Sequence, residues 1–171
     1  MARLERAALA HYLDSTFGNS TTTAAWFKIG IDNEDLTVNL NSDISTIKNV
    51  WGQSRVTHKG YAPSMGVNPY YANPADPIYP KLRDITLERK RGDACKTLML
   101  EIIAEDTEAT NHLAFVEEVM IDPQEYGGPD GGINISYTIN NNGNRKKGYV
   151  TAASTAAGTP VFTAGEMPTE G

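Results

Sequence analysis

Residues 70–103, YYANPADPIYPKLRDITLERKRGDACKTLMLEII, predict one helix followed by one apolar strand. Asp76 is a favoured N-cap residue and Pro77 suits the first helical position, so the predicted helix spans residues 76–90. Three apolar residues at helical spacing would form its buried face: Ile78, Leu82 and Ile85. The stretch therefore favours a helix laid against a β-sheet.

Charge and composition mark the end of this helix and the start of the strand. Cations at residues 89–91 suit the carbonyl end of a helix, and Gly92 suits the left-handed position after it. The apolar run at residues 94–104 predicts a strand, although short apolar runs also occur in helices. Cys95 lies in this run and is interpreted as buried packing rather than a reactive thiol.

Strand patterns separated by turn residues fill most of the remaining chain. Further strands are predicted at residues 26–31, 36–40, 44–51, 113–121, 133–139 and 145–151. The first two of these would form a hairpin across an acidic turn. The last two would form a hairpin across NNNGN at residues 140–144, because Asn and Gly tolerate positive φ.

The segments outside these strands divide the chain into an arm, a domain and an extension. Polar residues 1–24 predict an N-terminal arm, residues 25–152 a single domain, and residues 153–171 a mobile C-terminal extension. Inside the domain, residues 52–75 form a long loop rich in Gly, Pro and Tyr, and residues 122–132 a glycine-rich loop. A loop as long as 52–75 is either a contact surface or a surface loop packed on its own domain.

Composition excludes several classes of function. The three histidines are far apart, and the chain carries no metal-binding, serine-nucleophile or phosphate-loop motif. We therefore predict no enzyme activity, no metal and no cofactor. Apolar runs are too short for membrane insertion, and the single cysteine excludes an intrachain disulfide and fits folding in a reducing cytosol.

The net charge of −6 is unevenly distributed along the sequence. No lysine or arginine occurs between Lys96 and Arg145, an interval that holds nine acidic residues. These acids are either solvated loop residues or a segregated acidic surface that faces something specific.

The chain resembles the major tail tube proteins of tailed bacteriophages. The resemblance rests on the layout of MARLERAALAHYLD, DLTVNLNSDISTIKNVWGQSRVTHKGYAPSM, YYANPADPIYPKLRDI, LMLEIIA, VMIDPQEYGG and INISYTINNNGNRKKGYVT. Together these segments cover residues 1 to about 151 in the family's order. The Gly-Tyr-Ala-Pro element at residues 60–63 and the start of the predicted helix are the most specific parts.

The resemblance implies a β-sandwich or small barrel with one flanking α-helix, assembling into hexameric rings. Stacked rings would form a hollow tube in the virion, assembled in the host bacterial cytoplasm, through which DNA passes without specific binding. The implied protein partners are further copies of the chain, a tape measure protein, and tail terminator and baseplate proteins. The arm, the loop at 52–75 and the C-terminal extension would bridge subunits and rings.

Candidate site residues follow from this expectation. Acidic side chains would suit a lumen wall, because DNA phosphates must slide past it, and the candidates are Glu101, Glu117, Glu118 and Asp122. The candidates for contacts between subunits are Arg3, Arg6, Trp51, Arg55, Tyr61, Met65, Tyr70 and Tyr71.

Two alternative functions remain open on the sequence. One is the inner tube of a contractile injection system, whether a sheathed tail, a bacteriocin or a type VI-like machine, with a sheath protein as an added partner. The other is a virion-associated β-sandwich binding module. That module would need clustered exposed aromatics, whereas Trp26 and Trp51 are interpreted as strand packing.

Overall fold

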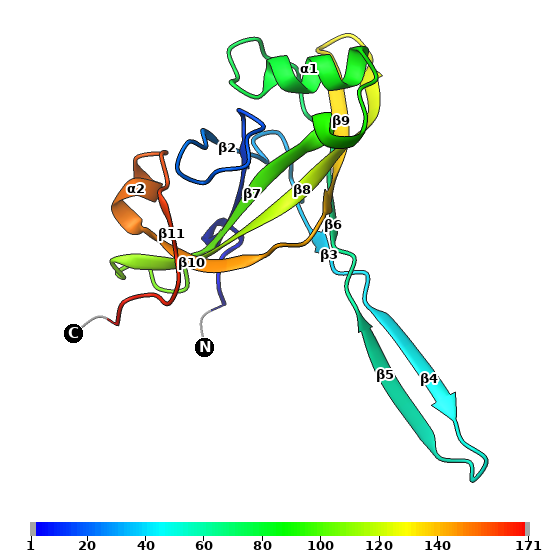
Figure 1. Cartoon of the computed structure of the whole chain (residues 1–171). Helices are drawn as coiled ribbons and strands as arrows, with labels where there is room; N and C mark the ends of the chain where they lie inside the picture. Colours follow the sequence, from blue (N-terminus) through cyan, green and yellow to red (C-terminus); the bar gives the residue numbers. More distant parts are fainter. Residues whose placement is uncertain (1–2, 170–171) are drawn as a thin grey trace.

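The structure is a computed structural model that describes residues 3–169 (Figure 1). Antiparallel strands dominate it, which confirms the mainly β prediction. The strands are β1 (Leu9–Asp14), β2 (Trp26–Lys28), β3 (Val38–Asn39), β4 (Asp43–Lys48), β5 (Ser54–Gly60), β6 (Ser64–Val67), β7 (Lys96–Ile103), β8 (Asn111–Gly127), β9 (Asn134–Asn141), β10 (Lys146–Thr151) and β11 (Phe162–Ala164). The helical elements are α1 (Tyr79–Leu87), α2 (Ala152–Ala156) and short 3-10 helices at Arg6–Ala8 and Gly92–Cys95.

Strand β8 organises the main sheet because both of its edges are paired. Residues 113–120 pair with β7 on one edge, whereas residues 111–116 pair with β10 and residues 119–127 with β9 on the other. Within residues 3–169 the main sheet has nine strands in the order β2-β1-β7-β8-β9-β6-β3, with β10 and β11 branching from β8. Because β8 continues to Gly127, the first half of the predicted loop at 122–132 is strand.

The predicted hairpin around residues 140–144 is wrong. Instead of pairing with each other, β9 and β10 pair in turn with the same edge of β8. Between them, the Asn142 N–H donates to the Glu118 carbonyl at 2.8 Å, and the Glu118 N–H donates to the Gly143 carbonyl at 3.3 Å. Gly143 and Asn144 have positive φ angles of 91° and 57°. The segment is a bulge in one interrupted strand, because positive-φ residues suit bulges as well as turns.

The N-terminal part of the chain also differs from the predictions. β2 pairs with β1 and β3 pairs with β6, so the predicted hairpin of residues 26–31 with 36–40 is wrong. Within the predicted arm, β1 lies between β2 and β7 and completely buries Leu13 and Asp14. This part of the arm belongs to the sheet, and its main partner β7 lies far away in the sequence.

Helix α1 is shorter than the predicted helix at 76–90. It begins at Tyr79, and the Asp76 carboxylate accepts a hydrogen bond from the Tyr70 hydroxyl at 3.1 Å instead of capping the helix. At the other end Arg89, with a φ of 53°, takes the left-handed position next to the helix, whereas Gly92, with a φ of 69°, lies further along at the start of a 3-10 helix. The predicted apolar face is confirmed, because Ile78, Leu82 and Ile85 are buried, with 0–3% of each residue exposed.

Apolar side chains cover both faces of the main sheet. On one face, Met99, Val119 and Ile139 form a core with Ile78 and Leu82 at α1. The opposite face carries a second core, which contains Leu98, Leu100, Ile102, Val116 and Val150, with Trp26 and Phe162 packed on it. Strand β7 contributes alternate residues to the two cores, as its continuous apolar run requires. Cys95 is buried as predicted, at 4% exposure, and burial raises the pKa of its thiol.

The two remaining predicted irregular segments both contain strands. The loop at 52–75 includes β5 and β6, and β5 pairs with β4 in a separate two-stranded sheet. The extension at 153–171 includes β11, which pairs with β10, and most of α2, which begins at Ala152. Strand β11 therefore joins the sheet instead of lying apart from it.

Gly148 makes the close approach of β10 to β11 possible. A Cβ atom at this position would lie 2.2 Å from the Thr163 carbonyl oxygen and 2.6 Å from the Phe162 ring. Gly148→Ala is therefore expected to detach β11, with a destabilisation of about 1–3 kcal/mol. Hydrogen exchange should show lost protection of β11. Gly66→Ala in β6 is the control, because its Cβ would have open space, and equal losses of stability would contradict the account.

Candidate functional site: the projecting hairpin and the groove at its base

The β4–β5 hairpin extends away from the rest of the molecule as a two-stranded ribbon (Figure 1). Its register pairs Thr46 with Val56 and Ile47 with Arg55. Alternation along the strands places Ile44 on the same face as Val56, and Ile47 on the opposite face. These three apolar residues are 56–65% exposed. Both faces of the ribbon therefore present apolar side chains to solvent.

The tip of the hairpin is held by the side chain of Asn49. Its Oδ1 accepts hydrogen bonds from the backbone N–H groups of Trp51 at 3.0 Å and Gln53 at 2.9 Å. Gly52 completes the turn with a φ of 77°. This local geometry leaves Val50 93% and Trp51 82% exposed. An apolar pair held outward in this way is typical of a contact surface rather than of packing within the chain.

A groove of about 700 Å³ lies where the hairpin joins the body. We call it the basal groove. Its apolar walls come from the N-terminal segment, from β3 and its flanks, and from the segment after β5, and consist of Leu9, Leu36, Val38, Leu40, Tyr61 and Pro63. Arg6 also lines it and donates a hydrogen bond to the Leu36 carbonyl at 2.7 Å, which ties the N-terminal segment to this wall.

Arg145 forms the charged floor of the basal groove together with two carboxylates. Its guanidinium contacts Glu101 at 2.6 Å and Glu117 at 3.2 Å, from neighbouring strands β7 and β8. The same group lies over the Phe115 ring, 4.3 Å from the ring centroid. A planar guanidinium suits this position because it can serve two carboxylates and an aromatic face at once.

Two further polar side chains contact the carboxylates of the floor. Nε2 of the buried His11 lies 2.8 Å from Glu101, and Asn141 donates a hydrogen bond to Glu117 at 2.8 Å. The hydrogen bond with His11 and the nearby Arg145 lower the pKa of Glu101 from 4.5 to about 2, against the opposing effect of burial. Glu101 therefore stays ionised at neutral pH, and two carboxylates face one guanidinium on the floor.

Charge is segregated between the hairpin and the rest of the chain. The hairpin, residues 43–60, carries the cations Lys48, Arg55 and Lys59 against the single acid Asp43, a net charge of +2. The whole chain has a net charge of −6, so the remainder carries −8. The hairpin is thus both cationic and apolar, and it extends from an acidic body.

The four predicted lumen residues do not share one surface. Glu101 and Glu117 lie on one face of the sheet, in the floor of the basal groove, with side chains only 19% and 6% exposed. Glu118 and Asp122 lie on the opposite face, because side chains alternate along β8. Glu118 accepts from Asn142 at 2.6 Å and lies 3.8 Å from Lys96. If some of the four candidates face a lumen, they therefore belong to one of these two pairs.

The predicted contact residues between subunits divide into exposed and buried groups. The exposed ones are Arg3, Arg6, Trp51, Arg55, Tyr61 and Tyr71. Met65 is fully buried and Tyr70 is 7% exposed, so their selection as contact residues is wrong. The interpretation of Trp51 as strand packing is also wrong, since it lies at the exposed hairpin tip. Arg6 and Tyr61, which line the basal groove, are among the predicted contact residues, and alternation at residues 36–40 is the sequence signal for β3 in its wall.

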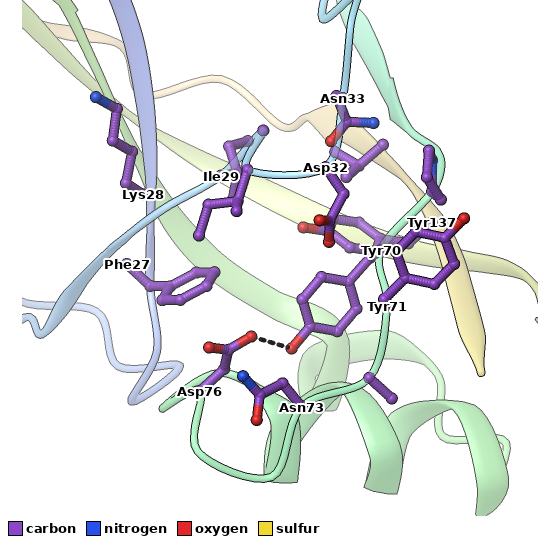
Figure 2. A pocket seen from close by; sticks show the side chains of 15 residues that line it. Phe27, Lys28, Ile29, Asp32, Asn33, Tyr70, Tyr71, Asn73, Asp76 and Tyr137 are labelled. Atoms are coloured by element: carbon purple, nitrogen blue, oxygen red, sulfur yellow. Dashed lines mark hydrogen bonds between the residues drawn. The ribbon is translucent and has the colours of Figure 1, made fainter. Parts of the chain in front are cut away.

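Tyr70 belongs to a smaller pocket between the turn after β2 and the loop before α1 (Figure 2). Its ring meets the Tyr137 ring edge-on, 6.3 Å between centroids, and its hydroxyl reaches Asp76. Burial and the neighbouring Asp76 raise the pKa of the Tyr70 hydroxyl strongly. These contacts fix the chain entering α1.

Comparison with protein-family models and with curated protein sequences returned no match. Among residues 3–169, no helix is long and apolar enough to cross a membrane. The same residues contain no group of three or more His, Cys, Asp or Glu side chains that could hold a metal ion. The hairpin and the basal groove are therefore the features from which a function is argued.

Proposed function

We propose that this chain is a structural virion protein that stacks as hexameric rings into a phage tail tube, a conduit for DNA ejection. The observation that carries the proposal is the projecting hairpin, which has exposed apolar residues on both faces and an exposed apolar tip. An isolated two-stranded ribbon of this kind is marginally stable in water, and burial of both faces between other subunits would stabilise it.

The ends of the main sheet also support self-association. Strands β2 and β3 stand at the two ends of the strand order among residues 3–169, so each has one edge without a strand partner. Such edges pair readily with another chain. Pairing between neighbouring subunits would extend the sheet around a ring, which accords with the resemblance of the sequence to tail tube proteins.

Negative-stain electron microscopy of the concentrated protein tests this function. We expect hollow filaments or six-fold rings. Residues 43–51 are nine residues, and at about 3.3 Å per residue the hairpin reaches about 30 Å from its base. The axial repeat of the filaments should therefore be at least about this length. Absence of the chain from intact virions by mass spectrometry would end the proposal, and an outer sheath in those virions would identify a contractile tail.

Substitutions at the hairpin tip should abolish assembly without unfolding the subunit. Val50→Ser with Trp51→Ser removes the two most exposed apolar side chains of the tip, far from both cores. We expect monomers in sedimentation velocity and an unchanged melting temperature. Ile31→Ser is the control, because Ile31 is also highly exposed, at 73%, but lies on a turn of the body. Normal filaments from the tip variant would contradict the role of the hairpin.

A further inference from the structure

We propose that the basal groove of one subunit receives the hairpin tip of a second copy of this chain. The proposal rests on the self-assembly proposed above and identifies the surface that receives the hairpin. It follows from the chemistry of two features at opposite ends of the same ribbon.

The apolar parts of the two features match. The tip presents Val50 and Trp51, both more than four-fifths exposed. The groove offers about 700 Å³ between apolar walls, and two of its wall residues, Leu40 and Tyr61, are 56% and 61% exposed. A tryptophan entering an apolar pocket is a common energetic centre of protein interfaces. Docking would therefore bury exposed apolar surface on both partners at once.

The net charges of the hairpin and of the receiving body are also opposite. The groove lining itself is balanced, since Glu101 and Glu117 lie there with Arg145 and Arg6. The body that surrounds the groove is acidic, because the chain outside residues 43–60 carries a net charge of −8 against +2 on the hairpin. The hairpin brings Lys48 and Arg55 close behind its tip, at the end of β4 and the start of β5. Opposite charge steers such an approach and fixes its register.

The hairpin cannot fill the groove of its own subunit. The groove lies at the base of the ribbon and is lined by Leu40 and Tyr61, which flank the hairpin in sequence. The tip lies about 30 Å away at the length of an extended strand. Each subunit therefore offers a tip and a groove at different places. Such a head-to-tail contact does not close on itself in a pair, and it can repeat along a stack.

Disulfide trapping in the full-length chain tests the contact. We would pair Val50→Cys at the tip with Thr37→Cys in the groove, and in a second variant with Leu40→Cys. Under mild oxidation at least one pair should give a ladder of covalent oligomers, because a disulfide requires Cβ atoms about 3.5–4.5 Å apart. The native Cys95 does not compete, since it is buried. Val50→Cys with Ile31→Cys is the control and should give no ladder.

The outcomes separate this contact from the proposed function. Filaments without a ladder from either groove pair would overturn the groove and leave the tube standing. A ladder without rings or filaments would support the groove and overturn the tube. Absence of both the ladder and the filaments would overturn both proposals.

Discussion

Arg145→Met is expected to lower the free energy of unfolding by about 2–3 kcal/mol. The substitution leaves Glu101 and Glu117 without their shared cation, and the Glu117 side chain is only 6% exposed. Loss of one partner of a buried ion pair costs about 3–5 kcal/mol, and the 39% exposure of Arg145 reduces that value here. In a chain of this length the melting temperature should fall by roughly 5–10 °C.

A neighbouring cation provides the matched control for this prediction. Lys147 lies two residues further along and pairs with Glu166 at 3.4 Å, but both side chains are largely exposed. Lys147→Met should therefore change stability by less than about 1 kcal/mol. In the Arg145→Met background, adding Glu101→Gln and Glu117→Gln should recover part of the loss, because the uncompensated charges are gone. Equal shifts for the Arg145 and Lys147 variants in urea unfolding would contradict a special role for the floor.

Glu101 is expected to make the protein sensitive to acid between about pH 4.5 and pH 2. The pKa of this carboxyl is lowered from 4.5 in the unfolded chain to about 2 in the fold, chiefly by the hydrogen bond with His11. A lowered acid pKa contributes stability above pH 4.5, and that contribution is lost as the pH falls toward 2. For a side chain 19% exposed, the contribution at neutral pH is about 2–3 kcal/mol.

The Glu101→Gln variant isolates this effect from the titration of other acids. We would measure urea unfolding of both proteins from pH 7 to pH 2. The variant should be less stable by about 2 kcal/mol at pH 7, and the difference should shrink below pH 4.5, because the wild-type carboxyl takes up a proton there. A constant difference across the whole range would show that the stabilisation does not depend on ionisation of Glu101.

Features encoded by adjacent residues were predictable from the sequence. The apolar face of α1 and the burial of β7 follow from the spacing of Ile78, Leu82 and Ile85 and from one continuous apolar run. Local periodicity suffices in such cases because the element and its buried face are defined by the same few residues.

Features that depend on the choice of distant partners were not predictable. The NNNGN segment has the residue types of a hairpin turn, but β8 is long enough to pair with both β9 and β10 on one edge, so the segment becomes a bulge. The basal groove depends equally on distant partners, since Leu9, Leu36 and Arg145 meet only in the fold. Sequence spacing carries no information on such encounters.

The short pairing of β3 with β6 has a consequence for how such chains can vary. It joins Val38 to Met65 and Asn39 to Ser64, and the Ala62 N–H donates to the Leu40 carbonyl at 3.2 Å. The last strand pair of the main sheet is thus complete before the ribbon begins. Lengthening or shortening the ribbon by whole residue pairs leaves the register of every core strand untouched. Ribbon length can therefore diverge between lineages as a spacer, under constraints separate from those on the body.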